Sequence, residues 1–309
     1  MASFAKALFV ILAVLVAAYA AYRYAWYSGP YVLDRCEPSR RLNLDGFFSQ
    51  IEPFLQRFHE DRASFDPRDL RGRFSSRAGG DIDLYGSADM VFVLWILDEL
   101  ETRSTDPGRR EWASVIQAFQ DRRTGLFEPG PAAAESTMHA TAFATAALKL
   151  LGSRPRHPHA WAEPLFADRK AIRRWIDSLD WRQIWTGSHE LGAVAAIIDA
   201  PEGIDLPPEW ADWTLEAFAE KLDDETGFWK NGPLDRIWRR PTTIDLGGAA
   251  HFWWIYHHLG HPIPYPEKVI SGALALQRRT GLWGTRLFNG AYPQGIDFDA
   301  LNGLRLAWS

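Results

Sequence analysis

Apolar residues recur with the spacing of α-helices along most of the chain, and loops rich in Gly, Pro and Asp separate the helical stretches. No alternating apolar and polar pattern, as expected of a half-buried strand, continues for long. Helices polar on one side occur at 109–120, 208–221 and 266–277. Helices that are apolar or small nearly all round, and must therefore be buried, occur at 90–97, 140–151, 191–198, 247–257 and from Ala300. Residues 45–309 are predicted to form an all-α domain.

A sequence motif repeats at a nearly fixed interval. Segments that end in Thr-Gly-apolar-aromatic, each after an amphipathic helix, are 119–127, 222–229 and 276–283. Gly227 lies 102 residues after Gly125 and 54 before Gly281, which gives a period of 51 to 54 residues with one copy skipped. A degenerate copy at 179–187 occupies the skipped place, and Gly72 lies 53 residues before Gly125. The chain therefore contains five copies of one structural unit.

Each unit consists of an outer helix, a glycine turn, a loop and an inner helix. We expect the glycine to end the outer helix in the left-handed conformation, with the aromatic residue two positions later packed on that helix end. Outer helices around a ring of parallel inner helices form an α/α toroid. Six pairs would close a regular ring, and the fifth inner helix has few residues before Ser309. We therefore expect an incomplete ring, or one in which the N-terminal segment fills the gap.

The repeated motif resembles that of a known group of proteins. The pattern Gln277-x-x-x-Gly281-x-Trp283 is similar to the core of the QW repeat of terpenoid cyclases, and 223–229 and 120–127 are near variants. The resemblance extends over residues 45–309 and implies the toroid of terpenoid cyclases and protein prenyltransferases. It does not imply their chemistry, because the motif is structural and similar toroids serve glycoside hydrolases and polysaccharide lyases.

The N-terminus carries a membrane-directed segment. Residues 7–22 are apolar and uncharged, Lys6 precedes them, and Arg23 and an aromatic group at 24–27 follow. We predict that residues 1–28 are an uncleaved anchor, because aromatic residues suit the membrane interface. A cleaved signal peptide is the alternative, with 18–20 as its small-x-small site. We expect residues 29–44 to be a linker and the body to be extracytoplasmic, in a periplasm or lumen, with a cytoplasmic body as the alternative.

Composition narrows the classes of partner. With 34 basic and 39 acidic residues and no long run of either sign, the chain has no nucleic-acid footprint. The single cysteine, Cys36, cannot close an internal disulfide or build a Cys-rich zinc site. The 15 Trp and 18 Phe residues predict an aromatic core or a cavity walled by rings. We therefore expect a small lipid or glycan substrate, membrane contact through the N-terminal segment, and no cofactor.

Ionisable side chains gather at the starts of all five inner helices, which a toroid brings to one mouth. They are Asp81, Asp83, Tyr85, Asp89, Glu135, His139, His189, Glu190, Asp245, His251, Asp297 and Asp299. Aspartate at such a place is also an ordinary helix cap. The residues that we predict to be catalytic are Asp83, His139, His189, Asp245 and Asp299. The residues that we predict to contact substrate are Tyr85, Glu190, His251, Trp253 and Asp297.

The chain lacks the catalytic motifs of the proteins that it resembles. Class II terpenoid cyclases use Asp-x-Asp-Asp, and 81–84 and 297–300 each miss the last carboxylate. Protein prenyltransferases use an Asp, Cys, His zinc site, whereas Cys36 lies beside the membrane segment. Another cluster, at 257–261, contains His257, His258 and His261, but Gly260 marks a helix end and we predict no metal there.

Three functions remain at the level of the sequence. The first is a membrane-anchored toroid enzyme that acts by acid–base catalysis on a lipophilic, isoprenoid-like substrate in a central aromatic cavity. The second is a carbohydrate-active hydrolase, lyase or epimerase with the same toroid. The third is a non-catalytic binding or assembly protein, in which the recurrent acids and histidines are separate helix caps.

Overall fold

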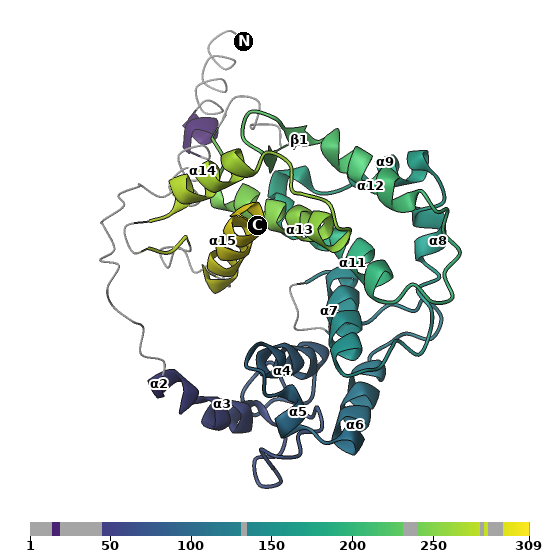
Figure 1. The fold of residues 1–309 in the computed structure, drawn as a ribbon, viewed down its shortest axis with the longest axis vertical. Coiled ribbons are helices and arrows are strands. Elements are labelled where there is room, and N and C mark those ends of the chain that lie inside the picture. Colours follow the sequence, from purple (N-terminus) through teal and green to yellow (C-terminus); the bar gives the residue numbers. More distant parts are fainter. Residues whose placement is uncertain are drawn as a thin grey trace, which may run out of the picture. The chain divides into compact units, whose positions relative to one another are not determined.

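A computed structural model describes residues 14–18, 45–130, 135–230, 240–278, 281–283 and 293–308. These residues are mostly α-helical, as predicted, with one short antiparallel strand pair (Figure 1). Among them, no helix has the length and apolar character needed to cross a membrane. The predicted linker at 29–44 lies outside the described residues, and so does the predicted membrane segment at 1–28 apart from residues 14–18.

The described chain divides into two compact units, each of which is described by itself. Of the described residues, the N-terminal unit contains those within 45–179 and 188–217, and the C-terminal unit contains 14–18 and those within 180–187 and 218–308.

The N-terminal unit is built from alternating buried and amphipathic helices. They are α2 (Asp45–Phe48), α3 (Ile51–Phe58), α4 (Leu84–Ile96), α5 (Leu100–Arg103), α6 (Asp106–Gln117), α7 (Thr137–Leu150), α8 (Ala162–Leu165), α9 (Arg169–Asp177), η2 (Ser188–Leu191), α11 (Gly192–Asp199) and most of α12 (Trp210–Ala219). The mostly buried helices α4, α7 and α11 pack side by side in that order, α4 on α7 and α7 on α11 (Figure 1). The amphipathic α6 also packs against α4 and α7.

The C-terminal unit repeats this arrangement. It contains η1 (Trp181–Gln183), α10 (Ile184–Gly187), the end of α12, β1 (Leu222–Asp223), β2 (Phe228–Trp229), α13 (Thr243–His258), α14 (Pro266–Leu276) and α15 (Pro293–Trp308). Helix α13 is buried along nearly its whole length and packs against α10 and α15, and α14 packs against α15. In chain order, the described helices include the pairs α3/α4, α6/α7, α9/α11, α12/α13 and α14/α15, one for each of the five predicted units.

The last inner helix differs from the prediction. It begins at Pro293 rather than Ala300 and has 16 residues, as many as α13. Ile296 and Ala300 are both buried and lie one turn apart, so the apolar face starts earlier than the prediction placed it. Gly303 continues this face, and a Cβ there would lie 2.5 Å from the Trp253 ring.

The turn that recurs in the repeat is a small hairpin and not the predicted helix cap. Helix α6 ends at Gln117, and the later Gly125 donates its N–H to the Asp121 carbonyl at 2.8 Å. Gly125 has a φ of +75°, so its left-handed conformation is confirmed. The Asp121 carboxylate accepts the N–H groups of Arg123 and Thr124 at 3.0 and 2.7 Å, which closes the turn locally and lowers the pKa of Asp121.

The aromatic residue of the motif packs back on the outer helix, as predicted. Trp229 Nε1 donates to the Phe218 carbonyl at 2.8 Å, and Trp283 Nε1 donates to the Ala273 carbonyl at 2.6 Å. The glutamine closes the other side of the turn, since Gln277 Nε2 donates to the Gly281 carbonyl at 2.7 Å. The Gln-Gly-aromatic pattern is therefore a packing device.

The degenerate copy at 179–187 does not form this turn. Its Gly187 lies within α10, and a Cβ there would lie 2.6 Å from the Asp180 carbonyl oxygen. Because Gly187 has no side chain, the backbone at Asp180 can approach it closely.

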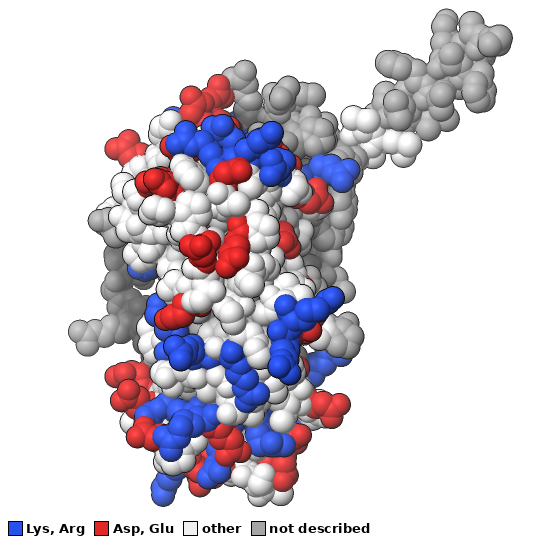
Figure 2. Space-filling model, turned by 90° about the vertical axis from the view of Figure 1, so that its right-hand side faces the viewer, with Lys and Arg blue, Asp and Glu red and all other residues white. Residues whose placement is uncertain are grey.

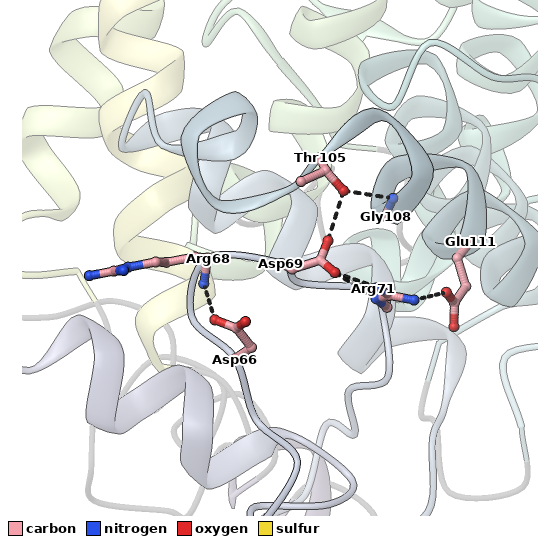
Figure 3. Close-up of polar contacts among 7 residues, drawn as sticks. All are labelled: Asp66, Arg68, Asp69, Arg71, Thr105, Gly108 and Glu111. Atoms are coloured by element: carbon pink, nitrogen blue, oxygen red, sulfur yellow. Dashed lines mark hydrogen bonds and ion pairs between the residues drawn. The ribbon is translucent and has the colours of Figure 1, made fainter.

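A loop in the N-terminal unit is tied to the start of α6 (Figure 3). Thr105 caps the helix by accepting the N–H of Gly108 at 3.2 Å, and its hydroxyl donates to Asp69 at 2.8 Å. Arg71 binds both Asp69 and, at 2.9 Å, Glu111. These bonds from Arg71 and Thr105 lower the pKa of Asp69.

Over the face seen in Figure 2, acidic and basic side chains are interspersed.

Candidate functional site

Three helix starts bring polar side chains together in the N-terminal unit. Ser136 caps α7 by accepting the N–H of His139 at 3.2 Å, so His139 lies in the first turn. Gly192 opens α11, and a Cβ there would lie 2.5 Å from the Met138 carbonyl oxygen. Because Gly192 has no side chain, η2 approaches the start of α7 and His189 comes to lie beside His139.

The first polar pair joins α4 to α7. The Tyr85 hydroxyl and His139 Nδ1 form a hydrogen bond of 2.9 Å. The His139 ring stacks on Phe143, one turn further along α7, with 4.5 Å between ring centroids. Phe143 also contacts the rings of Tyr85 and Phe92, at 5.6 and 5.5 Å between centroids. One flank of the pair is therefore aromatic.

The second polar pair joins η2 to the segment before α7. His189 Nδ1 and Glu135 Oε2 are 2.9 Å apart, and the side chains are only 10% and 20% exposed. The rings of His139 and His189 lie 4.7 Å apart, centroid to centroid. The two pairs are therefore neighbours and form one cluster.

A half-buried carboxyl group lies beside these two pairs. Asp89 lies on α4 one turn after Tyr85, and burial raises the pKa of Asp89 to about 7. The negative charges of Asp83 and Glu135 raise this pKa further, after burial. Burial disfavours a carboxylate, and nearby like charges add to that cost. Asp89 therefore exchanges its proton near neutral pH.

Such a cluster has the groups that proton transfer requires. A carboxylate on Nδ1 of a histidine holds the ring in place and makes Nε2 the nitrogen that takes up or releases a proton. A carboxyl group with a pKa near the working pH is an effective general acid. We name Tyr85, Asp89, Glu135, His139 and His189 the proton-transfer cluster.

Part of this cluster is predicted from the sequence. His139 and His189 are predicted to be catalytic and Tyr85 to contact substrate, and the structure brings these three together. Asp89 and Glu135 are among the ionisable residues at the inner helix starts, but neither is among the predicted site residues. The helical spacing of Asp89 from Tyr85 was the available signal, since residues four apart share a helix face.

Two other predicted residues of the N-terminal unit lie near this region. Asp83 caps α4 by accepting the N–H of Gly86 at 2.7 Å. Its second oxygen accepts bonds from Ser76 N, Ser76 Oγ and Ser75 Oγ at 2.8, 2.8 and 3.1 Å. Asp83 therefore has a structural role as the N-cap of α4. Glu190 follows His189 in η2 and is half-buried.

The predicted residues of α13 lie in the C-terminal unit. Asp245 is buried and forms a capping box with Thr242, whose N–H and hydroxyl each donate to Asp245 Oδ2 at 2.7 Å. His251 is half-buried in the middle of the helix. Trp253 is fully buried, with its ring 5.3 Å from that of Phe228, centroid to centroid. Asp245 thus has a structural role, and Trp253 belongs to the core.

The prediction placed Asp297 and Asp299 before the last inner helix, whereas in the structure both lie inside α15. The earlier start of the helix explains this correction. Asp297 accepts the N–H of Trp283 at 2.6 Å, so it holds the repeated turn. Burial raises the pKa of Asp299 to about 8.

Comparison with known proteins assigns the chain to no family. No model of a known protein family matches the chain, and no curated protein matches it either.

Proposed function

We propose that this chain is an enzyme that acts by proton transfer, with the proton-transfer cluster as its catalytic centre. One observation carries the proposal: two hydrogen-bonded pairs, Tyr85 with His139 and His189 with Glu135, stand with their histidine rings 4.7 Å apart. Separate helix caps would not need such a juxtaposition. A positioned acid or base typically contributes about 10²–10⁴-fold to a rate.

The cluster supplies a distinct group for each proton. Asp89 is the general acid, because its carboxyl group is still partly protonated near pH 7. His189, oriented by Glu135, is the general base that removes a proton from substrate or from a water molecule. Tyr85 and His139 carry a second proton between them.

We propose a lipophilic, isoprenoid-like substrate and a membrane-anchored, extracytoplasmic enzyme. The aromatic rings of Phe92 and Phe143 beside the cluster support an apolar substrate, and the apolar run at 7–22 supports anchoring. The five helix pairs support an α/α toroid similar to that of terpenoid cyclases. In such a ring the first turns of the inner helices share one mouth, which is where we place the substrate.

Two further functions each have an observation in their favour. The Tyr85–His139 hydrogen bond suits a carbohydrate lyase or epimerase, in which a histidine and a tyrosine exchange the proton next to a uronate carboxyl group. The capping roles of Asp83 and Asp245 agree with a non-catalytic protein, which predicts caps at these places.

An isotope experiment separates the three functions. The full-length chain is incubated in D₂O with polyprenols and polyprenyl diphosphates in one set and uronate-containing polysaccharides in another, and products and deuterium are measured by mass spectrometry. We expect conversion or deuterium uptake in the polyprenyl set, lowered at least about 100-fold in Asp89→Asn and His189→Gln.

Matched controls are Glu101→Gln and His257→Gln, which change exposed side chains and should leave the rate unchanged. Turnover in the uronate set alone would replace the lipid substrate by the carbohydrate one. Absence of turnover in both sets, from a chain whose circular dichroism shows it folded, would contradict the proposal in favour of a non-catalytic protein. Full activity in both cluster variants would also contradict it.

A further inference from the structure

We propose that the exposed aromatic side chains of α2 and α3, in the N-terminal unit, bind the surface of a lipid bilayer. We name Phe47, Phe48 and Phe54 the aromatic patch. The folded domain itself makes this contact, in addition to the apolar run at 7–22. The inference rests on the proposed function in so far as it starts from an anchored chain, and it assigns the face by which the domain lies on the membrane.

The side chains of the aromatic patch are open to solvent. Phe47, Phe48 and Phe54 are 58%, 51% and 43% exposed, although phenylalanine is among the residues most often buried. Phe47 and Phe48 contact each other edge to face, with 5.6 Å between ring centroids, and Phe54 contacts the half-buried Phe58 at 4.8 Å. Apolar side chains gathered in this way are typical of a surface that binds a protein, a ligand or a membrane.

Helix α3 packs on the core by a different set of side chains. Ile51 and Leu55 are 6% and 0% exposed and belong to the hydrophobic core of the N-terminal unit. A helix at the surface of a water-soluble domain usually carries polar residues outside its core face. Helix α3 instead exposes Phe54, and α2 before it exposes Phe47 and Phe48 (Figure 1). Apolar side chains both inside and outside suit a helix that lies between a protein core and a bilayer.

The polar groups beside the patch suit the depth of lipid headgroups. The exposed Arg57 has its guanidinium carbon 5.7 Å from the centre of the Phe58 ring. An arginine so placed can lay its apolar stem along the acyl boundary and keep its charge among the headgroups. The acidic side chain of α3, Glu52, lies 3.9 Å from Arg103 Nη1 in an ion pair, which offsets its charge. Apolar insertion rather than attraction to anionic lipid therefore provides the binding.

The place of the patch in the chain favours a bilayer as its partner. Phe47 follows the last residue of the apolar run, Tyr22, by 25 residues. This length spans at most about 85 Å even when fully extended, so an anchored chain keeps the patch close to the same membrane surface. A tethered site binds at a high effective concentration, and weak insertion of three side chains is then sufficient. Two membrane signals together are also what stable attachment typically requires.

A second copy of the chain is a poorer partner for the patch. A phenylalanine can bury roughly 200 Å², so the exposed fractions of the three side chains amount to about 300 Å² per chain. A symmetric pair would bury about 600 Å² of this surface, which is below the roughly 1,000 Å² expected of a stable protein interface. A bilayer contact has no such threshold, because its binding adds to that of the N-terminal segment.

Spin labelling of the full-length chain tests the contact. Cys36, the single cysteine, is replaced by serine, and one nitroxide is attached at Ser49→Cys, an exposed position between Phe48 and α3. The chain is reconstituted in phosphatidylcholine vesicles, and electron paramagnetic resonance measures collisions of the nitroxide with oxygen and with a water-soluble nickel chelate. An interfacial helix buries its apolar face by about 5–10 Å, so we expect the label to report lipid. The ratio of oxygen to nickel collisions should be several-fold higher than at Ser114→Cys, an exposed site on α6 of the same unit.

Substitutions in the patch identify the side chains responsible. Phe47→Ser, Phe48→Ser and Phe54→Ser together should return the label at position 49 to the ratio seen at position 114, because no large apolar group is left to insert. Leucine at the same three positions should preserve lipid contact, since a bilayer binds apolar area and does not select rings. All three side chains are exposed, and circular dichroism checks that both variants fold.

The outcomes separate this contact from the proposed function. Sedimentation with the vesicles reports the anchor by itself. A chain that sediments while its label at position 49 stays aqueous keeps the anchor and overturns the contact, whereas a chain that does not sediment overturns both. Lipid contact with no turnover would support the surface and count against the enzyme.

Three further results would also overturn the bilayer contact. One is a label that reports lipid equally in the serine variant. Another is loss of contact in the leucine variant, which would indicate a protein partner that fits the rings. The third is dipolar broadening between labels on two chains, which would assign the patch to a second copy.

Discussion

Replacement of Asp89 by asparagine should stabilise the protein at alkaline pH. Burial raises the pKa of Asp89 from 3.8 to about 7 in the folded chain. Between these two values the unfolded chain has lost the proton and the folded chain still holds it. The folded state thus binds more protons, and the free energy of unfolding falls as pH rises. Asparagine has a similar shape and does not titrate, so the variant escapes this loss.

The size of the effect follows from the two pKa values. One pKa unit corresponds to about 1.4 kcal/mol, so the ionisation of Asp89 costs the folded chain about 4 kcal/mol above pH 7. About 1.7 kcal/mol of this cost is already present at pH 5, because the unfolded chain is ionised there. The stability difference between Asp89→Asn and the wild-type chain should therefore grow by about 2.5 kcal/mol from pH 5 to pH 8.

Denaturant unfolding at pH 5 and pH 8, followed by tryptophan fluorescence, measures this difference. Comparing the two pH values removes any constant effect of the substitution on packing. Asp81→Asn is the control, because it replaces an exposed carboxyl group three residues before α4, which lacks the burial on which the predicted effect depends. A difference for Asp89→Asn that stays constant between pH 5 and pH 8 would refute the reasoning.

Two predictions concern the repeated turn. Gly125→Ala should lower stability by roughly 3 kcal/mol in thermal unfolding, because the new Cβ would lie 2.3 Å from the Pro158 carbonyl oxygen at a φ of +75°. Gly79→Ala, at a φ of +74° with no atom within 4 Å, should lose only about 1 kcal/mol, and equal losses would show that packing is not the cause. Trp229→Phe should lose about 2–3 kcal/mol in urea unfolding, because the Phe218 carbonyl loses its donor and a cavity forms. A loss below about 1 kcal/mol would show that the hydrogen bond from Trp229 to Phe218 does not stabilise the turn.

The helix pairs could be predicted from the sequence because their signals are local. The Thr-Gly-aromatic period located the units, and the all-round apolar stretches identified α7 and α13 as buried. Helices α4, α7, α13 and α15 nevertheless begin earlier than predicted. Helix α4 starts at Leu84 because Asp83 caps it, and the polar residues Tyr85 and Asp89 inside the first turns obscured the apolar face.

The composition of the cluster depends on tertiary contacts that no local pattern contains. The two histidines stood out because histidine is a poor cap and lies in helices with little charge. Glu135 could not be assigned, since it precedes α7 in the chain and its role comes from His189, 54 residues later. Asp245 was predicted to be catalytic, but its capping box with Thr242 gives it a structural role.

The titration of the Asp89 carboxyl group tests the central claim most directly. It can be followed by ¹³C NMR of the full-length chain labelled at aspartate, with Asp89→Asn to assign the signal. The account predicts a midpoint near pH 7, and a lower midpoint in Glu135→Gln because one of the neighbouring negative charges is removed. A midpoint near 4 that does not respond to Glu135→Gln would show that Asp89 and Glu135 do not belong to one proton-transfer centre.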